Sequence, residues 1–118
     1  MSGEPASESM AIVINRDGMG RGDQELQHKL LRTFLRLVLE NGKLPGAICL
    51  YTDGVRLATA DSPVLAELRA LEERGVHVIL CKTCLDHLGL AGSVEVGTVG
   101  GMGDIIAAQW IAGKVVTL

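Results

Sequence analysis

The sequence predicts an α/β protein, a three-layer α/β/α sandwich built on an open, mainly parallel five-stranded sheet. Short runs rich in β-branched residues alternate along the chain with segments whose apolar residues recur at helical spacing. Such alternation favours parallel strands joined by crossover helices. The length of 118 residues suits one domain. We expect that domain over residues 10–118, after a small, polar, flexible tail over residues 1–9.

Five short apolar runs are the expected strands. Each has the composition of a strand that is buried on both faces of a parallel sheet. They cover residues 10–14, 47–51, 76–80, 94–96 and 114–118.

The expected helices lie between these strands. Leu26, Leu30, Phe34 and Val38 recur every fourth residue and predict a long helix that ends near Gly42. A neighbouring row of leucines widens its apolar stripe, which indicates burial against both the sheet and another subunit.

Ser62 and Pro63 open a second helix as N-cap and first helical residue, and its charged side chains, Glu67 among them, are expected to face water. A helical turn over residues 85–88 and a helix over residues 104–112 complete the pattern.

Composition restricts the class of partner. The net charge of −3 and the three aromatic residues argue against nucleic-acid binding, which usually needs a basic face and stacking rings. No apolar run approaches membrane-spanning length, and the polar, acidic start does not resemble a signal peptide. Three cysteines, an odd number, do not form a secreted disulfide framework. We therefore expect a cytoplasmic protein that binds neither nucleic acid nor membrane.

The candidate site follows from strand direction. Loops after parallel strands emerge at one edge of the sheet, where α/β proteins keep their chemistry. Cys81 and Cys84 directly follow the expected strand over residues 76–80, and we predict that they are the catalytic residues. The residues expected to bind substrate at the same edge are Asp53, Gly20, Gly22, Thr83 and His87.

A cysteine at a helix amino terminus is stabilised as thiolate, which favours Cys81 over Cys84. Cys84 either resolves an intermediate on Cys81 or is itself the exposed thiol. Alternatively, both thiols are small apolar residues of the core. With His87 they also form a C-x2-C-x2-H pattern, but this supplies only three metal ligands; we expect no metal and no cofactor. Cys49 is expected in the core, and Trp110 in the core or at a subunit interface.

Several segments together resemble the DsrE-like sulfur-relay family, most closely the carboxyl-terminal domain of YedF-like selenium-metabolism proteins. The resemblance runs from about residue 10 to residue 118, and the cysteine segment with Gly89 eight residues after Cys81 is its most specific part. The segments that carry it are residues 13–15, 19–26, 50–58, 62–65 and 81–86.

The resemblance implies an open parallel sheet, a homo- or hetero-oligomer and a cysteine that carries persulfide. The position of the glycine selects Cys81, whereas the YedF-like type has both cysteines. YedF-like proteins also have an amino-terminal TusA-like domain with its own cysteine, where this chain has a nine-residue polar tail. We therefore expect a sulfur- or selenium-handling persulfide carrier with a TusA-like donor or acceptor protein. The alternative is a noncatalytic oligomeric assembly subunit with structural cysteines.

Overall fold

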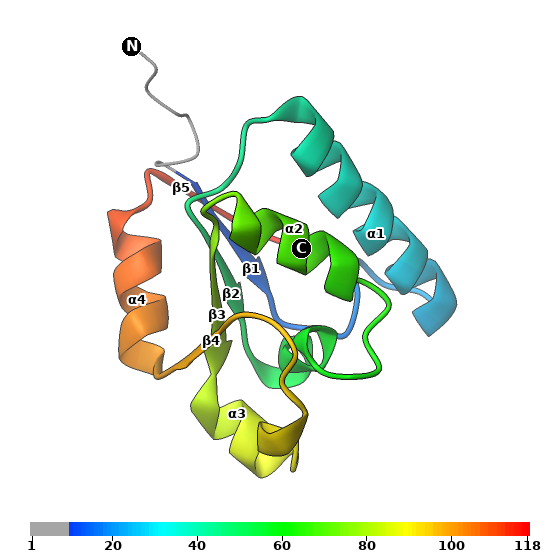
Figure 1. The fold of residues 1–118 in the computed structure, drawn as a ribbon, viewed down its shortest axis with the longest axis vertical. Helices are drawn as coiled ribbons and strands as arrows, with labels where there is room; N and C mark the ends of the chain where they lie inside the picture. Colours follow the sequence, from blue (N-terminus) through cyan, green and yellow to red (C-terminus); the bar gives the residue numbers. More distant parts are fainter. Residues whose placement is uncertain (1–9) are drawn as a thin grey trace.

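The computed structural model describes residues 10–118, so the tail expected over residues 1–9 lies outside the described residues. Five strands form one sheet in the order β4-β3-β2-β1-β5, and every neighbouring pair is parallel. This confirms the predicted α/β class (Figure 1). The strands are β1 (Met10–Ile14), β2 (Ala47–Leu50), β3 (His77–Cys81), β4 (Thr98–Gly100) and β5 (Lys114–Thr117).

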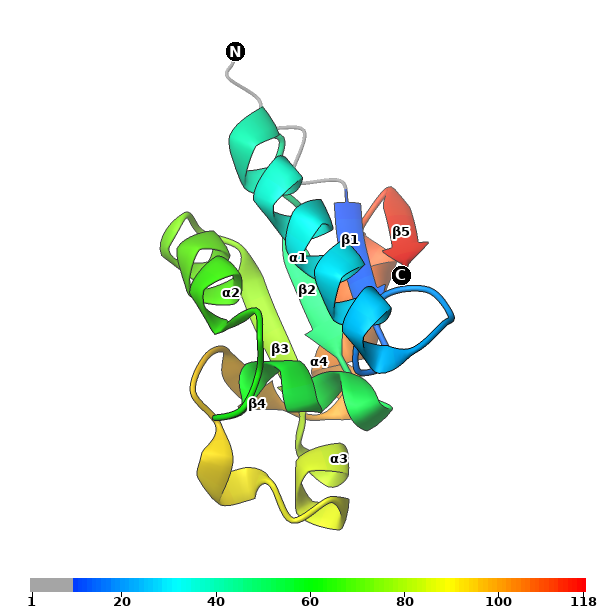
Figure 2. The ribbon, with the colours of Figure 1, turned by 90° about the vertical axis from the view of Figure 1, so that its right-hand side faces the viewer.

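Helices cover both faces of the sheet and give the three expected layers. Helices α1 and α2 lie side by side on one face, α4 covers the other, and α3 extends beyond the end of β3 (Figures 1 and 2). None of the helices in residues 10–118 is long and apolar enough to cross a membrane. The α-helices are α1 (Gln24–Asn41), α2 (Leu65–Glu73), α3 (Lys82–His87) and α4 (Met102–Ile111), and the 3-10 helices are η2 (Thr52–Ala58) and η3 (Ala91–Ser93).

The core lies on both faces of the sheet, under α1 and α2 on one face and around Ile105 of α4 on the other. All four residues of β2 are buried, as the apolar run predicted. Helix α1 buries Leu31 and Leu35, whereas Leu26 and Leu30 of its wide stripe are exposed. Burial of this stripe against another subunit therefore stays a prediction.

The fourth strand was predicted at the wrong place. It covers 98–100, where it pairs with β3, and not 94–96. Val94 instead forms an isolated antiparallel bridge with Thr59, and the next backbone N–H, that of Glu95, donates to the Ala58 carbonyl. This segment is thus bound to the end of η2, and the chain joins the sheet only after a turn at Gly97.

Two details of α2 also differ from expectation. Helix α2 begins at Leu65, and the Ser62 hydroxyl accepts a hydrogen bond from the Val64 N–H at 3.0 Å in the turn before it. Glu67, expected to face water, is 8% exposed, because Arg36 of α1 reaches across to its carboxylate at 3.1 Å. The two helices are thereby joined by an ion pair.

Candidate functional site

The carboxyl ends of β1, β2 and β3 meet at one edge of the sheet. Ile14 lies opposite Leu50, and Leu50 lies opposite Leu80, so the loops that follow these strands start side by side. The Thr52 hydroxyl donates to the Asn15 carbonyl at 2.7 Å, which ties the loop after β2 to the loop after β1. The sheet thus brings together segments that are far apart in the sequence.

A crevice of about 330 Å³ opens at this edge, between η2 and α3. It contains four of the residues predicted for the site, one of the two cysteines among them. Thr52 and Leu88 also line it, and sequence reasoning missed both. The lining residues are Thr52, Asp53, Thr83, Cys84, His87 and Leu88.

The two cysteines differ in their access to this crevice. Cys81 is the last residue of β3 and the N-cap of α3, its side chain caps no backbone N–H, and it is only 3% exposed. Cys84 lies three residues further along, is half-buried and lines the crevice. The resemblance selects Cys81, but Cys84 is the thiol that the structure opens to the crevice.

The Cys84 sulfur receives a hydrogen bond from a strained part of the backbone. The Thr52 N–H donates to Cys84 Sγ at 3.1 Å. Thr52 has φ = 48°, the one positive φ outside glycine in the described chain, a conformation that costs a non-glycine residue about 1 kcal/mol. Backbone strain of this kind clusters at functional sites. The sequence shows only Thr52-Asp53-Gly54 after a strand, which indicates a turn but not the direction of this N–H.

The surroundings of Cys84 do not stabilise a thiolate in the way the sequence suggested. Burial raises the pKa of Cys84, the neighbouring Cys81 side chain raises it further, and the hydrogen bond from the Thr52 N–H lowers it. The net shift of the pKa is upward. Lys82, which lies between the two cysteines in the sequence, pairs with Asp86 at 2.7 Å, and this carboxylate raises the pKa of Lys82.

The glycine-rich loop after β1 does not reach the crevice. The Arg16 guanidinium donates to the Gly20 carbonyl at 2.6 Å, and the Gln27 amide donates to the Gly22 carbonyl at 2.9 Å. These contacts fold the loop against the start of α1. Gly20 and Gly22, predicted to bind substrate, are therefore not brought to Cys84.

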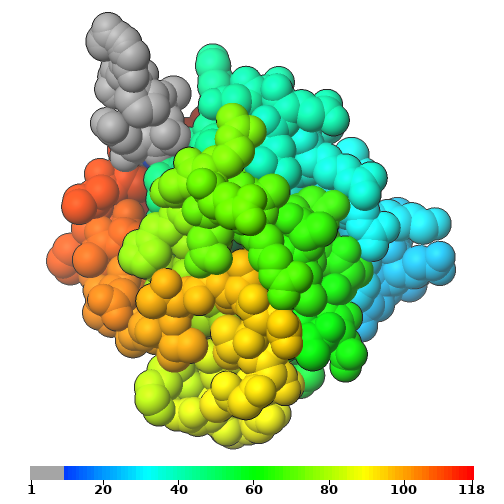
Figure 3. Space-filling model, viewed as in Figure 1, coloured from blue at the N-terminus to red at the C-terminus, as the bar shows by residue number. Residues whose placement is uncertain are grey.

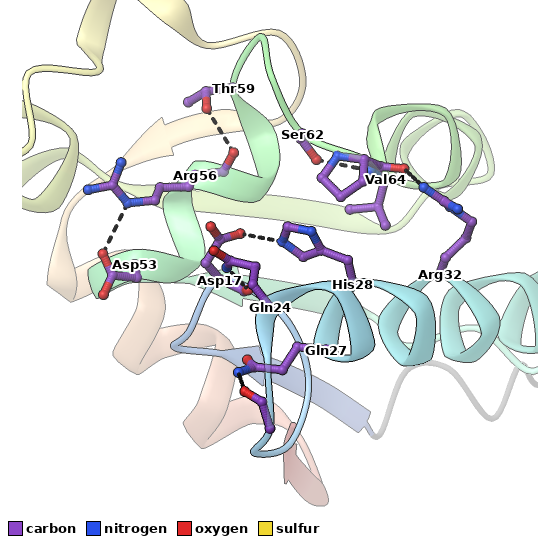
Figure 4. A network of polar contacts seen from close by, with 12 residues as sticks. Asp17, Gln24, Gln27, His28, Arg32, Asp53, Arg56, Thr59, Ser62 and Val64 are labelled. Carbon is purple, nitrogen blue, oxygen red and sulfur yellow. Dashed lines mark hydrogen bonds and ion pairs between the residues drawn. The ribbon is translucent and has the colours of Figure 1, made fainter.

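Two separate polar contacts lie near each other, one between α1 and this loop and one within η2 (Figure 4). His28 of α1 lies 3.1 Å from the Asp17 carboxylate, and Arg56 donates to Asp53 at 3.1 Å. His28 and Arg56 also line a cavity of about 170 Å³ with Asp61, between α1 and the segment before α2. Because Asp53 lines the crevice, its contact with Arg56 holds a carboxylate at the crevice wall.

The structure also describes the third cysteine, Cys49, and the residues whose spacing allowed a metal site. Cys49 lies in β2 and is fully buried, as predicted, and burial raises its pKa. Within residues 10–118, no group of three or more His, Cys, Asp or Glu side chains is placed to hold a metal ion. Cys81, Cys84 and His87 thus do not form the three-ligand group that their spacing allowed.

Comparison with known proteins identifies the family of this chain. The model of the DsrE/DsrF-like family matches residues 10–118. The chain belongs to the DsrE/DsrF-like family. Membership indicates a function related to sulfur relay, while closeness to the YedF-like type stays a prediction. Among curated proteins, none matches the chain.

Solved structures agree with the DsrE/DsrF-like fold. The chain is similar to the ychN protein from E. coli, with 24% identity and a TM-score of 0.70 over 94% of this chain and 99% of that one. It is also similar to MTH1491 from Methanobacterium thermoautotrophicum, with 19% identity and a TM-score of 0.67 over 92% and 97%. BT1422 from Bacteroides thetaiotaomicron has 17% identity and a TM-score of 0.64 over 96% and 97%. At these identities the likeness concerns the fold alone.

Proposed function

We propose that this protein is a small sulfur carrier in which the Cys81–Cys84 pair takes up sulfane sulfur as a persulfide and passes it to a partner's thiol. The observation that carries the proposal is the position of Cys84. Its sulfur faces a crevice at the carboxyl edge of the sheet and accepts a hydrogen bond from the Thr52 N–H. Membership of the DsrE/DsrF-like family supports sulfur as the cargo.

Persulfide exchange starts when a thiolate attacks the outer sulfur of a donor persulfide, and the donor leaves as a thiolate. The reaction needs a thiol that the donor can reach and a contact that favours the anion. Cys84 has both, the second from the Thr52 N–H. Because the pKa of Cys84 is raised, little thiolate is present at neutral pH, and sulfur uptake becomes faster as the pH increases.

Incubation with inorganic polysulfide, followed by desalting and intact-mass spectrometry, tests this proposal. We expect wild-type protein to gain sulfur or to convert to an internal disulfide. The Cys81→Ala/Cys84→Ala double variant retains Cys49 and serves as the control that gains nothing. Equal modification of the wild-type protein and the double variant, or none of either, contradicts the proposal.

The sulfur donor or acceptor is, in this proposal, a second protein of the TusA-like type, as the resemblance implies. Residues at the rim of the crevice, His87 and Thr83 on α3 and Asp53 on η2, are exposed and are positioned to contact such a protein. Selenium in place of sulfur would use the same exchange. The three cysteines are free, which suits the reducing cytoplasm expected from the sequence.

Self-association is the second part of the proposed function, and α4 supports it. Trp110, expected in the core or at a subunit interface, is 83% exposed, so the core is ruled out. Met102 and Ile106 precede it at four-residue intervals and are also exposed, so the three share one face of the helix. Helix α4 forms one flank of the molecule (Figure 3), and β5, which follows it in the chain, is an edge strand with an exposed Val115.

Exposed apolar side chains on one helix face mark interaction sites, and we assign this face of α4 to a second copy of the chain. Sedimentation velocity of wild type and Trp110→Glu tests the assignment, with Ala66→Glu on the exposed side of α2 as the matched control. We expect an oligomer that only Trp110→Glu dissociates. A monomeric wild type would contradict it. The alternative function, an assembly subunit with structural cysteines, predicts this oligomer together with slow alkylation of both Cys81 and Cys84.

A further inference from the structure

The two thiols of the site are neighbours with unequal access. Cys81 is buried and Cys84 lines the crevice. Their side chains are nevertheless neighbours, because the N-cap of α3 and a residue three positions later lie on the same side of a helix. A donor or acceptor protein that enters the crevice therefore meets Cys84, while Cys81 is within reach of Cys84 alone.

We infer that Cys84 receives the sulfur and that Cys81 is a resolving thiol, which converts the Cys84 persulfide to a Cys81–Cys84 disulfide and releases hydrogen sulfide. This assignment of roles rests on the proposed function. It differs from the choice of Cys81 that the resemblance implies.

The reaction balances without an external oxidant. Cys81 loses its proton and attacks Cys84 Sγ, the inner sulfur of the persulfide. The bond between the inner and outer sulfur breaks, the disulfide forms, and the outer sulfur leaves as hydrosulfide and takes up the proton. The Cys81 sulfur is oxidised and the outer sulfur is reduced. A dithiol reductant then returns the pair to its starting state by thiol–disulfide exchange.

Two fates of the persulfide follow from the access of each sulfur. A partner thiolate in the crevice attacks the outer sulfur and receives it, with Cys84 as the leaving group. In the absence of a partner, Cys81 attacks the inner sulfur, because this attack is intramolecular and needs no encounter. A resolving cysteine next to an accessible one is a known arrangement in redox-active proteins. The pair would thus transfer sulfur when a partner is bound and release it as sulfide when none is bound.

The chain offers a convenient readout for this inference. Trypsin cleaves after Lys82, so Cys81 and Cys84 fall into separate peptides, residues 75–82 and 83–114. A disulfide between them joins these two peptides, and a trapped persulfide adds the mass of one sulfur atom to one of them. Cys49 lies in a third peptide and reports on nonspecific modification.

The experiment loads full-length protein with inorganic polysulfide, desalts it, and then follows sulfide release and peptide masses after alkylation. In wild type we expect sulfide release together with joined peptides. In Cys81→Ala we expect added sulfur that persists on residues 83–114 and sulfide release slower by about tenfold or more. Cys84→Ala is expected to take up no sulfur. Urea midpoints show whether each variant is folded, and Cys81→Ser replaces Cys81→Ala if the latter is not.

Three results would overturn the inference. Sulfide release from Cys81→Ala at the wild-type rate would remove the resolving role. Sulfur on residues 75–82 of wild type would reverse the two roles. Persistent persulfide in wild type without joined peptides would leave the carrier function standing but refute the internal reaction. Failure of the proposed function gives a separate result, which is no sulfur uptake by any of the proteins.

Discussion

Replacement of Gly54 by alanine should destabilise the fold at the base of the crevice. Gly54 is buried in η2, directly against the end of β1. A Cβ on Gly54 would stand 2.8 Å from the Ile14 carbonyl carbon and nearer still to its oxygen. Ordinary contact begins at 3.4 Å, so the backbone of β1 or η2 would have to shift by at least about 0.6 Å. Because both sides of the clash are backbone, no side chain can rotate to relieve it.

Overpacking of this kind costs about 3 kcal/mol, the upper end of its usual range. With an m-value of about 1.5 kcal/mol/M, the urea midpoint of Gly54→Ala should fall by about 2 M. Gly103→Ala in α4 is the matched control, because a Cβ there meets nothing within 4 Å and alanine favours a helix by about 1 kcal/mol over glycine. A midpoint for Gly54→Ala at or above that of wild type would refute the close approach of η2 to β1.

Three further predictions concern an ion pair, the buried thiol and the strained residue. Arg36→Ala leaves the buried carboxylate of Glu67 without its cation and should lower the free energy of urea unfolding by about 1 kcal/mol. The control Arg69→Ala removes an exposed pair with Glu95 and should lower it by under about 0.5 kcal/mol. Equal losses would contradict the burial of Glu67. Burial raises the pKa of Cys49, so the folded state holds this proton more tightly than the unfolded state. The resulting stability is complete below the pKa of the unfolded thiol and is lost as the pH rises through the pKa of the folded thiol. Wild type should therefore lose more stability than Cys49→Ala between about pH 8 and 10. Parallel pH profiles of the two proteins would contradict this prediction. Thr52→Gly and Thr52→Ala both remove the hydrogen bond from the hydroxyl to Asn15, but only glycine relieves the strain of the positive φ. Thermal unfolding should show Thr52→Gly to be more stable than Thr52→Ala by about 1 kcal/mol. Equal stability of the two variants would mean that Thr52 is not strained.

Strong periodic signals predicted most of the architecture. The β-branched run over residues 10–14 is β1, and the four-residue repeat that begins at Leu26 lies within α1, which ends before a left-handed Gly42. Alternation of such segments was sufficient for the parallel sheet. The sequence could not distinguish 94–96 from 98–100 as the fourth strand, because the choice depends on pairing of Gly100 with Cys81 and of Val94 with Thr59. These contacts join distant parts of the chain.

The edge of the sheet that holds the site was predicted from strand direction, but the contacts and the exposure of its residues were not. Strand direction placed Asp53 and the cysteine segment at one edge, and both are in the crevice wall. The greater exposure of Cys84 than of Cys81 was not predictable, because β3 continues one residue beyond the apolar run and buries Cys81. The hydrogen bond from Thr52 to Cys84 depends on a single backbone dihedral angle, which no residue pattern in the sequence specifies.

The central claim is that Cys84 is open to an incoming molecule while Cys81 and Cys49 are enclosed. A brief pulse of N-ethylmaleimide on native wild type, followed by unfolding, a heavy-isotope form of the same reagent and trypsin, measures this directly. We predict light label on residues 83–114, which contain Cys84, and heavy label on the peptides that contain Cys81 and Cys49. Heavy label on all three peptides, or light label on Cys81 ahead of Cys84, would contradict it.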